Sequence, residues 1–242
     1  MLRVLDLFSG AGMFSLGLER TGGFETVAFC EFEEFPRRVL ARHWPEVPCF
    51  HDVTSAQFDE IGPVDVVTAG FPCQDISLAG KGAGLAGERS GLFWHVLRAA
   101  CVVGRPKLLL ENVAALLDRG MGAVLGALAS LGYDAEWHCI PASAVGAPHR
   151  RDRVWIVADA QRDEQPREKP CVWPFGRMGR VEQSVAWDAG WEATLSALRG
   201  VDDGDARSVD RTDLTRNSLV PQIPELIGHA ILAAEREKTC AS

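Results

Sequence analysis

Short apolar runs alternate with helix-like segments along the first 160 residues. The apolar runs are rich in Val, Ile, Leu and Phe, as the buried strands of a parallel sheet are, and they lie at Leu2–Phe8, Thr26–Cys30, Val64–Ala69, Lys107–Leu110 and Arg153–Ala158. The segments with helical spacing lie around Met13–Thr21, Glu34–His43, Gly91–Val103 and Gly122–Leu131. This alternation predicts an α/β fold, a doubly wound and mainly parallel sheet that binds ligands at the carboxyl ends of its strands.

The pattern changes after residue 160. Residues 161–216 are polar, poorly periodic and rich in Arg, Asp, Gly and Trp, which predicts a small irregular lobe. Helical spacing returns at Pro221–Glu237. We therefore expect a main domain at residues 1–160, a small lobe at 161–216, and a C-terminal segment at 217–242 that returns to the main domain.

Composition places the chain among globular proteins, since 47% of its 242 residues are hydrophobic. No apolar run is long enough to span a membrane, and the N-terminus leads directly into a predicted strand rather than a secretory signal. A cytoplasmic location is therefore expected. The seven cysteines are scattered and never spaced as CxxC, which disfavours a disulfide framework or a zinc site, and most are expected to be buried.

The net charge of −8 at pH 7 argues against nucleic-acid binding if composition is considered alone. Arginine and lysine nevertheless outnumber the acids between residues 149 and 180. A local basic face on an acidic body can contact phosphates. A solvated, charged loop explains the same residues equally well.

Glycines follow the first predicted strand in the segment DLFSGAG, where they permit a tight turn and close approach of a ligand. Gly10, Gly12 and Gly17 do not have the G-x-G-x-x-G spacing of a dinucleotide site. Glu31 closes the second strand, where an acid can bind both ribose hydroxyls of a nucleoside. Asp52, further along, can accept from an adenine amino group. Either acid alone is as readily a helix cap or a surface carboxylate.

Cys73 follows the fourth predicted strand within the segment GFPCQDIS, and a glycine-rich stretch comes after it. A nucleophile on a mobile, glycine-rich loop suits an enzyme that closes over its substrate. A single cysteine after a strand is, however, more often a core residue, so its position alone does not decide its role.

Five segments, in this order, resemble the motifs of the DNA cytosine-5 methyltransferase family in its short phage or bacterial form. They are Asp6–Gly12, Gly70–Gln74, Glu111–Val113, His149–Arg153 and Asn217–Pro221. The resemblance implies the Rossmann-like fold of class I methyltransferases, with residues 161–216 as a short target-recognition region. It also implies a monomer that binds double-stranded DNA, needs no metal, and can have a restriction endonuclease as a partner.

By this resemblance the chain transfers a methyl group from S-adenosylmethionine to carbon 5 of a cytosine turned out of the duplex, leaving S-adenosylhomocysteine. Cys73 is the implied nucleophile at carbon 6, and Glu111 contacts the N3 and amino edge of the base. Arg151 and Arg153 favour the thiolate and hold the base or its phosphates.

The resemblance also implies two sets of binding residues. The cofactor set is Phe8, Ser9, Gly10, Gly12, Glu31, Phe32, Asp52, Val53, Pro72, Leu92 and Asn217. The DNA set, which rests partly on loop composition and on arginine as a guanine reader, is Gln74, Ser77, Lys81, Arg89, His149, Arg177 and Arg180.

Two features depart from the family pattern. The stretch available for target recognition is short, and Arg216 stands before Asn217 where the family usually has glycine. Three alternatives therefore stay open. They are an RNA (tRNA) cytosine methyltransferase, a catalytically impaired DNA-binding homologue, and a nicotinamide oxidoreductase, the last disfavoured by the glycine spacing.

Overall fold

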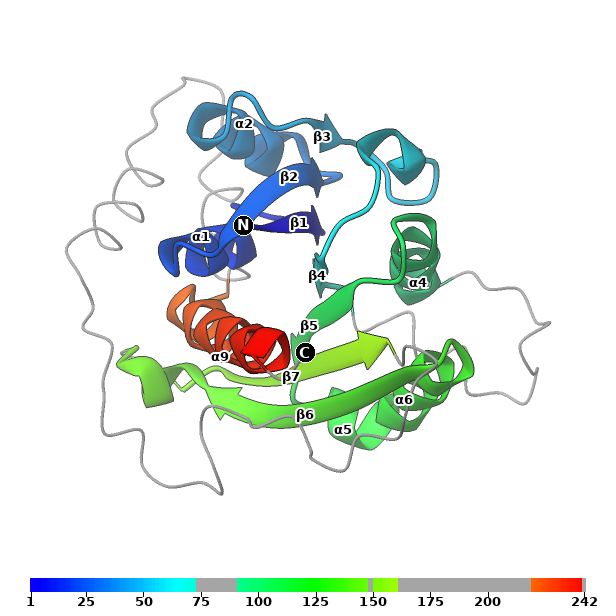
Figure 1. The fold of residues 1–242 in the computed structure, drawn as a ribbon, viewed down its shortest axis with the longest axis vertical. Coiled ribbons are helices and arrows are strands. Elements are labelled where there is room, and N and C mark those ends of the chain that lie inside the picture. The colour runs from blue at the N-terminus through cyan, green and yellow to red at the C-terminus, as the bar shows by residue number, and fades with distance from the viewer. Residues whose placement is uncertain (73–90, 148–149, 161–218, 241–242) are drawn as a thin grey trace.

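The computed structural model describes residues 1–72, 91–147, 150–160 and 219–240. A single seven-stranded sheet forms its centre, with the strands in the order β3-β2-β1-β4-β5-β7-β6 (Figure 1). The strands are β1 (Leu2–Leu7), β2 (Phe24–Cys30), β3 (Cys49–Phe50), β4 (Val66–Gly70), β5 (Lys107–Val113), β6 (Tyr133–Pro141) and β7 (Asp152–Ala160). Only β7 runs against its neighbours, so the predicted fold, a mainly parallel α/β sheet, is confirmed.

Helices cover both faces of this sheet, as a doubly wound fold requires. They are α1 (Met13–Arg20), α2 (Glu34–His43), α4 (Leu92–Val102), α5 (Leu116–Arg119), α6 (Met121–Ser130) and α9 (Gln222–Cys240), with short 3-10 turns η1 (Phe58–Ile61) and η3 (Ala142–Val145). Side chains alternate along each strand, so one set packs on α4 and α6 and the other on α1 and α9. On β5, for example, Leu108 and Leu110 face the first pair and Leu109 faces the second.

Glycine allows α9 to lie directly against α1. A Cβ at Gly17 would collide with the backbone carbonyl oxygen of Pro221, and one at Gly228 would lie 3.0 Å from Leu18 and Thr21. The described part of the C-terminal segment therefore returns to the main domain, and Figure 1 shows α9 beside α1.

The structure also contains strands that the sequence pattern did not predict. The two-residue strand β3 is too short to give a periodic pattern. Strand β6 was missed, because an edge strand buries little and YDAEWHCIP carries charged and polar residues throughout. Strand β5 extends to Val113 rather than ending at Leu110, so Glu111 and Asn112 lie within the strand.

The expectation that most cysteines are buried is wrong for two of the four described ones. Cys30 is buried and Cys49 partly so, whereas Cys101 and Cys139 are exposed. Cys101 lies on the outer side of α4 and Cys139 on an edge strand. The general tendency of cysteine to be buried therefore did not predict the exposure of these two residues.

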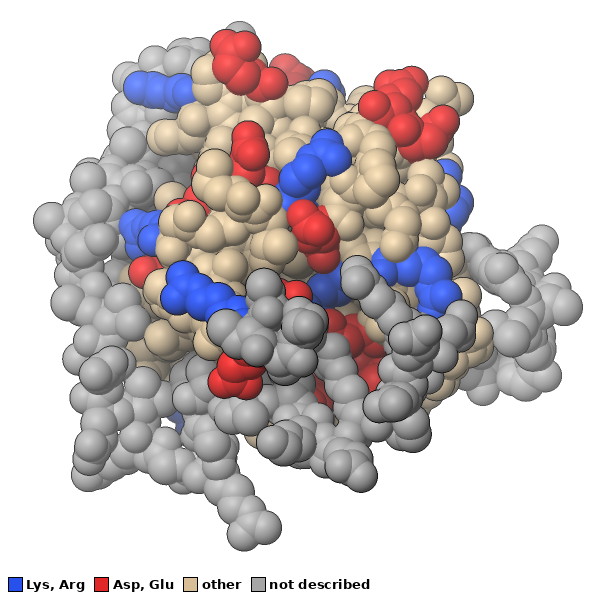
Figure 2. Space-filling model, in the orientation of Figure 1, with Lys and Arg blue, Asp and Glu red and all other residues tan. Residues whose placement is uncertain are grey.

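Acidic and basic side chains are interspersed on the face of the described residues that Figure 2 shows. The basic surplus expected between residues 149 and 180 lies mostly outside the described residues. No helix within the described ranges is long and apolar enough to cross a membrane.

Candidate active site

The charged and polar side chains of the candidate site lie at one edge of the sheet. The parallel strands β1, β2, β3, β4 and β5 all end there. Strand β7 begins at the same edge because it runs in the opposite direction, with Arg153 opposite Val113 of β5. Residues that follow five strands therefore meet residues that start a sixth.

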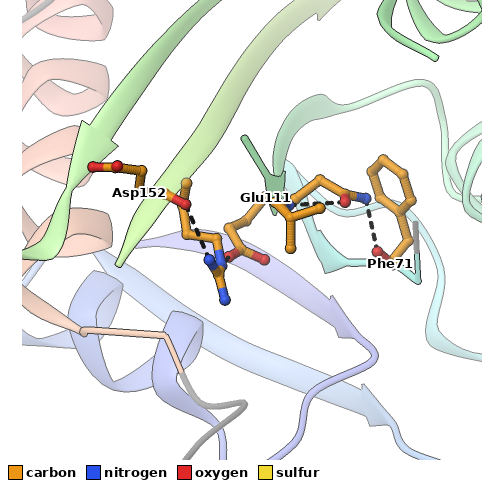
Figure 3. Close-up of polar contacts among 6 residues, drawn as sticks. Phe71, Glu111 and Asp152 are labelled. Carbon is orange, nitrogen blue, oxygen red and sulfur yellow. Dashed lines mark hydrogen bonds and ion pairs between the residues drawn. The ribbon is translucent and has the colours of Figure 1, made fainter. Parts of the chain in front are cut away.

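Glu111 is the enclosed acid of this edge. Its side chain is 12% exposed, and one carboxylate oxygen lies 2.8 Å from Nε of Arg153. Nη1 of Arg153 also donates to the Asp152 carbonyl at 3.0 Å, so the guanidinium is fixed from two sides. Figure 3 shows Glu111 between Asp152 and Phe71. Burial raises the pKa of Glu111, although the charges of Arg153 and Arg151 oppose the rise.

Arg151 precedes β7 in an unusual backbone conformation, with φ at +36°. Such conformations are costly for residues with a side chain and often occur at functional sites. Burial and the neighbouring Arg153 lower the pKa of its guanidinium, and Glu111 opposes that shift. Two guanidinium groups and one carboxyl thus share a partly dehydrated position, where electrostatic interactions are strong.

Asn112 lies on the opposite face of β5 from Glu111. Its side chain joins β5 to the segment that follows β4 through a pair of hydrogen bonds that we call the Asn112 clamp. Its Nδ2 donates to the carbonyl oxygen of Phe71 at 2.8 Å, and its Oδ1 accepts from the Val113 N–H at 2.8 Å. The Phe71 ring packs on Phe93 of α4, with the centroids 5.0 Å apart. The backbone that leads to Pro72 is therefore held from both sides.

The glycine turn after β1 is compact. Phe8, Gly10 and Gly12 all have positive φ values, between +54° and +79°. A side chain at Gly12 would meet the Trp44 ring at 2.7 Å, so glycine is needed there for space as well as for conformation. The Ser9 hydroxyl donates to the Asp6 carbonyl at 2.6 Å and closes the turn.

Asp6 links this turn to α1 and β4 through hydrogen bonds. It is fully buried, and its two carboxylate oxygens accept hydrogen bonds from Ser15 of α1 at 2.8 Å and from Thr68 of β4 at 2.7 Å. Burial raises the pKa of Asp6 to about 7, despite these two bonds.

Glu31 joins the glycine turn to the end of β2. Its carboxylate accepts from the Gly10 N–H at 2.7 Å and from the Glu33 N–H at 2.8 Å. A carboxylate has about four acceptor positions, so Glu31 retains capacity for two hydroxyl groups. Phe32, beside it, is 63% exposed and stacks at a tilt on His51, with the ring centroids 4.8 Å apart.

Asp52 follows β3 and opens a tight turn. Its Oδ1 accepts from the Thr54 N–H at 2.8 Å, and this bond lowers the pKa of Asp52. Val53, the next residue, is buried in the core. Asp52 is thus an ionised acceptor, and the exposed Phe32 ring and the Glu31 carboxylate also follow the ends of neighbouring strands. Such a set of groups fits a nucleoside.

Comparison with known proteins shows which proteins share this arrangement. The family model for C-5 cytosine-specific DNA methylases matches residues 2–175, most of the chain. The chain belongs to this family. Among solved structures, a DNMT2 mutant from Spodoptera frugiperda has the same fold, with a TM-score of 0.56 and 19% identity over 70% of this chain and 53% of that one.

Curated Type II methyltransferases are also similar in sequence. Type II methyltransferase M2.BsuMI of Bacillus subtilis (strain 168) is 36% identical over 83% of this chain and 53% of its own length. Type II methyltransferase M.NgoBI of Neisseria gonorrhoeae is 34% identical over 65% and 50%, respectively. The chain therefore spans about half the length of the curated relatives it matches.

Within this methylase family member, the structure brings several of the predicted site residues to one sheet edge. Glu111, Arg151 and Arg153 lie at the ends of β5 and β7, and Leu92 lies partly buried at the start of α4. The predicted cofactor residues at the ends of β1 to β4 are Phe8, Ser9, Gly10, Gly12, Glu31, Phe32, Asp52, Val53 and Pro72.

The remaining predicted residues lie outside the described ranges. They are Cys73, Gln74, Ser77, Lys81, Arg89, His149, Arg177, Arg180 and Asn217. Three residues with clear structural roles were not predicted: Asp6, Asn112 and Arg98. Asp6 and Asn112 lie inside the motifs quoted from the sequence, but the sequence did not indicate which residues they would hydrogen-bond. Arg98 lies on a helix face with no motif and gave no signal.

Proposed function

We propose that this chain transfers a methyl group from S-adenosylmethionine to carbon 5 of a cytosine in double-stranded DNA, through a covalent adduct with Cys73. The observation that carries the proposal is the enclosed Glu111 carboxyl, paired with Arg153 at 2.8 Å and with a raised pKa. Burial that raises the pKa of a carboxyl favours its protonated form, and this is the form that can donate a proton to a ring nitrogen. Membership of the methylase family gives that chemistry its substrate class.

The donor set at the ends of β1, β2 and β3 fits S-adenosylmethionine. Glu31 retains acceptor capacity for two ribose hydroxyls, Asp52 is an ionised acceptor for the adenine amino group, and Phe32 offers an exposed ring. A Cβ at Gly10 would meet nothing within 4 Å, which supports assigning the glycine turn after β1 to the methionine end. When bound, S-adenosylmethionine supplies a methyl group on a sulfonium, which is a strong electrophile.

Cys73 is assigned as nucleophile from its sequence position, two residues after Phe71. The Asn112 clamp on the Phe71 carbonyl supports this role, because it fixes the backbone that leads to Cys73. A thiolate that adds to carbon 6 moves the electron pair of the 5,6 double bond toward the ring carbonyl and N3. Glu111 protonates N3 as that negative charge develops, and carbon 5 becomes enamine-like.

Carbon 5 would then form a carbon–carbon bond to the methyl group as the bond from that methyl group to the sulfonium sulfur breaks, and S-adenosylhomocysteine would be the leaving group. A base removes the remaining carbon 5 proton, and its electron pair restores the double bond as the Cys73 thiolate leaves. The N3 proton returns to Glu111 and the base releases the carbon 5 proton to solvent, so the protein regains its starting protonation state. Arg153 and Arg151 hold Glu111 in place and favour anionic groups around it.

A stacked cytosine cannot present carbon 6 to a thiolate, so the target base has to leave the helix. Gln74, Ser77, Lys81, Arg89 and His149 are proposed to contact the opened duplex, and Arg177 and Arg180 to read its sequence. Asn217 is proposed to complete the cofactor site. We assign residues 161–216 the role of target recognition on the basis of their position between the matched motifs.

Bisulfite sequencing tests the proposal. The full chain is expressed in bacteria that lack cytosine methylation, and a resident plasmid is sequenced after bisulfite treatment. We expect one short sequence context to resist conversion in the wild type. The Cys73→Ala variant should give full conversion, while Cys101→Ala, which removes an exposed cysteine on α4, should behave as the wild type.

A trapping experiment separates the substrate classes. Duplex DNA and tRNA that contain 5-fluorocytosine are each incubated with the protein and S-adenosylmethionine, because fluorine at carbon 5 prevents release of the enzyme. A stable adduct with DNA, absent in Cys73→Ala, is expected. An adduct with tRNA alone would show that the substrate is RNA rather than DNA. No adduct with either would refute the proposed catalysis.

A further inference from the structure

Arg98 of α4 makes a contact that no proposed catalytic or cofactor role explains. Its Nη2 donates to the carbonyl oxygen of Val53 at 2.6 Å and to that of Ala56 at 3.3 Å. Its guanidinium carbon also lies 5.9 Å from the centre of the Phe58 ring. The side chain therefore reaches from α4 to the backbone between β3 and η1, and Figure 1 shows α4 beside that connection.

The backbone that Arg98 holds is the turn that begins with Asp52. Within this turn the Ser55 and Ala56 N–H groups both donate to the Asp52 carbonyl, at 3.2 and 2.9 Å. Arg98 takes two carbonyl groups of the same turn. The turn is thus closed internally by Asp52 and fixed to the rest of the protein by Arg98.

The position of this turn decides where the Asp52 carboxylate lies. The Thr54 N–H fixes the carboxylate relative to its own turn, and the same bond lowers the pKa of Asp52, so the group is ionised at neutral pH. An ionised carboxylate accepts a hydrogen bond from an amino group and repels a carbonyl oxygen. Discrimination between the two requires the carboxylate to be held at hydrogen-bond distance, since a displacement of a few tenths of an ångström weakens both effects.

We propose that Arg98 is a positioning residue for the purine edge of the cofactor, and that it sets selectivity for adenine by fixing the Asp52 turn. The proposal rests on the proposed function, because it takes Asp52 as the acceptor for the adenine amino group. Arg98 differs from lysine in this task, since the two N–H groups of its planar Nη2 point in fixed directions and Nη2 donates to both carbonyls, whereas the donors of an ammonium group rotate freely.

Binding of two nucleosides that differ at one position tests this role. S-adenosylhomocysteine carries an amino group at the purine edge, and S-inosylhomocysteine carries a carbonyl oxygen there. Affinities for both are measured calorimetrically with the full chain. Because a hydrogen bond to a charged group is at stake, we expect the wild type to prefer the adenosyl ligand by about 10- to 100-fold.

The variants separate positioning from general destabilisation. In Arg98→Met we expect the preference to fall below about threefold, because the adenosyl ligand loses affinity and the inosyl ligand loses its repulsion. Asp52→Ala should give the same loss of preference. Arg98→Lys should fall between Met and the wild type. Arg42→Met, which changes an exposed arginine on α2, should keep the wild-type preference.

Each outcome has a defined meaning. If Arg98→Met is folded by circular dichroism and weakens both ligands equally, the residue is merely structural and the inference is wrong. If Arg98→Met does not fold, Arg98→Lys decides, and an unchanged preference in it overturns the inference. A wild type that binds S-adenosylhomocysteine without preference also overturns it while leaving the proposed function intact. A wild type that binds neither ligand refutes both.

Discussion

Removing the Asn112 amide should disable the nucleophile without disturbing the cofactor site. In Asn112→Leu a side chain of similar volume replaces the clamp, and the Phe71 carbonyl loses the donor that lies 2.8 Å away. Asn112 is 3% exposed, so water cannot easily replace the amide. A buried carbonyl left without a partner costs about 1–3 kcal/mol of unfolding free energy.

The catalytic effect should exceed what this loss of stability explains. Cys73 follows Phe71 by two residues, and a displacement of about 1 Å in a reacting group can reduce a rate by about 100-fold. We therefore expect adduct formation with 5-fluorocytosine DNA to slow by roughly that factor. The affinity for S-adenosylhomocysteine should stay within about threefold of the wild type, because most of its proposed contacts follow β1, β2 and β3 and only Pro72 lies on the backbone that the clamp holds.

Two measurements check this prediction. Rates of adduct formation are followed by gel electrophoresis under single-turnover conditions, and unfolding free energies are obtained from urea denaturation. Thr26→Val is the matched control, since Thr26 is buried on β2 and its hydroxyl has no hydrogen-bond partner among the described residues. If Asn112→Leu is folded and forms the adduct at the wild-type rate, the clamp does not position Cys73 and the reasoning is wrong.

Three further predictions follow from single residues. Glu111→Gln keeps the size of the side chain but cannot donate an acidic proton, so methyl transfer should fall by about 10²- to 10⁴-fold, and initial rates with tritiated cofactor would show whether it does. Asp6 has its pKa raised from 3.8 to about 7. Its contribution to folding is therefore complete below about pH 4 and lost as pH rises to about 7, an effect of up to about 4 kcal/mol. Urea denaturation between pH 4 and 8 should show this decline in unfolding free energy in the wild type, superimposed on the contributions of the other titrating groups. The Asp6→Asn variant should lack the part that is due to Asp6. An identical dependence of unfolding free energy on pH in both proteins would contradict the raised pKa of Asp6. Gly17→Ala should lower the unfolding free energy by about 1–3 kcal/mol, because its new methyl group meets the Pro221 carbonyl. Gly126→Ala, in open space on α6, should be neutral or raise it by up to about 1 kcal/mol, and equal melting temperatures for the two variants would contradict the packing of α1 on α9.

Most of the parallel core could be predicted from the sequence because its longer strands contain runs of apolar residues. Strands buried on both faces give continuous runs of Val, Ile and Leu, and turns rich in glycine mark their ends. The edge strand β6 lacks this signal, since its outer side is solvated and its alternation is blurred by Glu136 and His138. Sequence periodicity reports burial, so an element that buries little is not visible to it.

The site could be predicted only as a set of positions. Glu111 was expected to contact the base, and Arg153 to favour the thiolate and hold the base or its phosphates. The structure shows that these two side chains also contact each other. Arg98 could not have been found, because its partners are backbone carbonyls of residues more than 40 positions away. Bonds from a side chain to a distant backbone leave no trace in the local sequence pattern.

The direction of β7 explains why the site has two kinds of residue. Ligands of a parallel sheet are contacted by residues that follow strands, and the proposed cofactor residues Asp52 and Glu31 have that position. Because β7 is antiparallel, the residues at its start reach the same edge: Arg151 precedes the strand and Arg153 lies at the start of its pairing with β5. Neighbouring side chains of β5 point to opposite faces of the sheet. Glu111 therefore contacts Arg153 of β7, and Asn112 contacts the Phe71 carbonyl, which follows β4. Since side chains alternate along a strand, an insertion of one residue in β5 before Glu111 would exchange the two faces. It should therefore abolish both the ion pair and the clamp together, whereas an insertion of two residues would keep the faces and shift only the register.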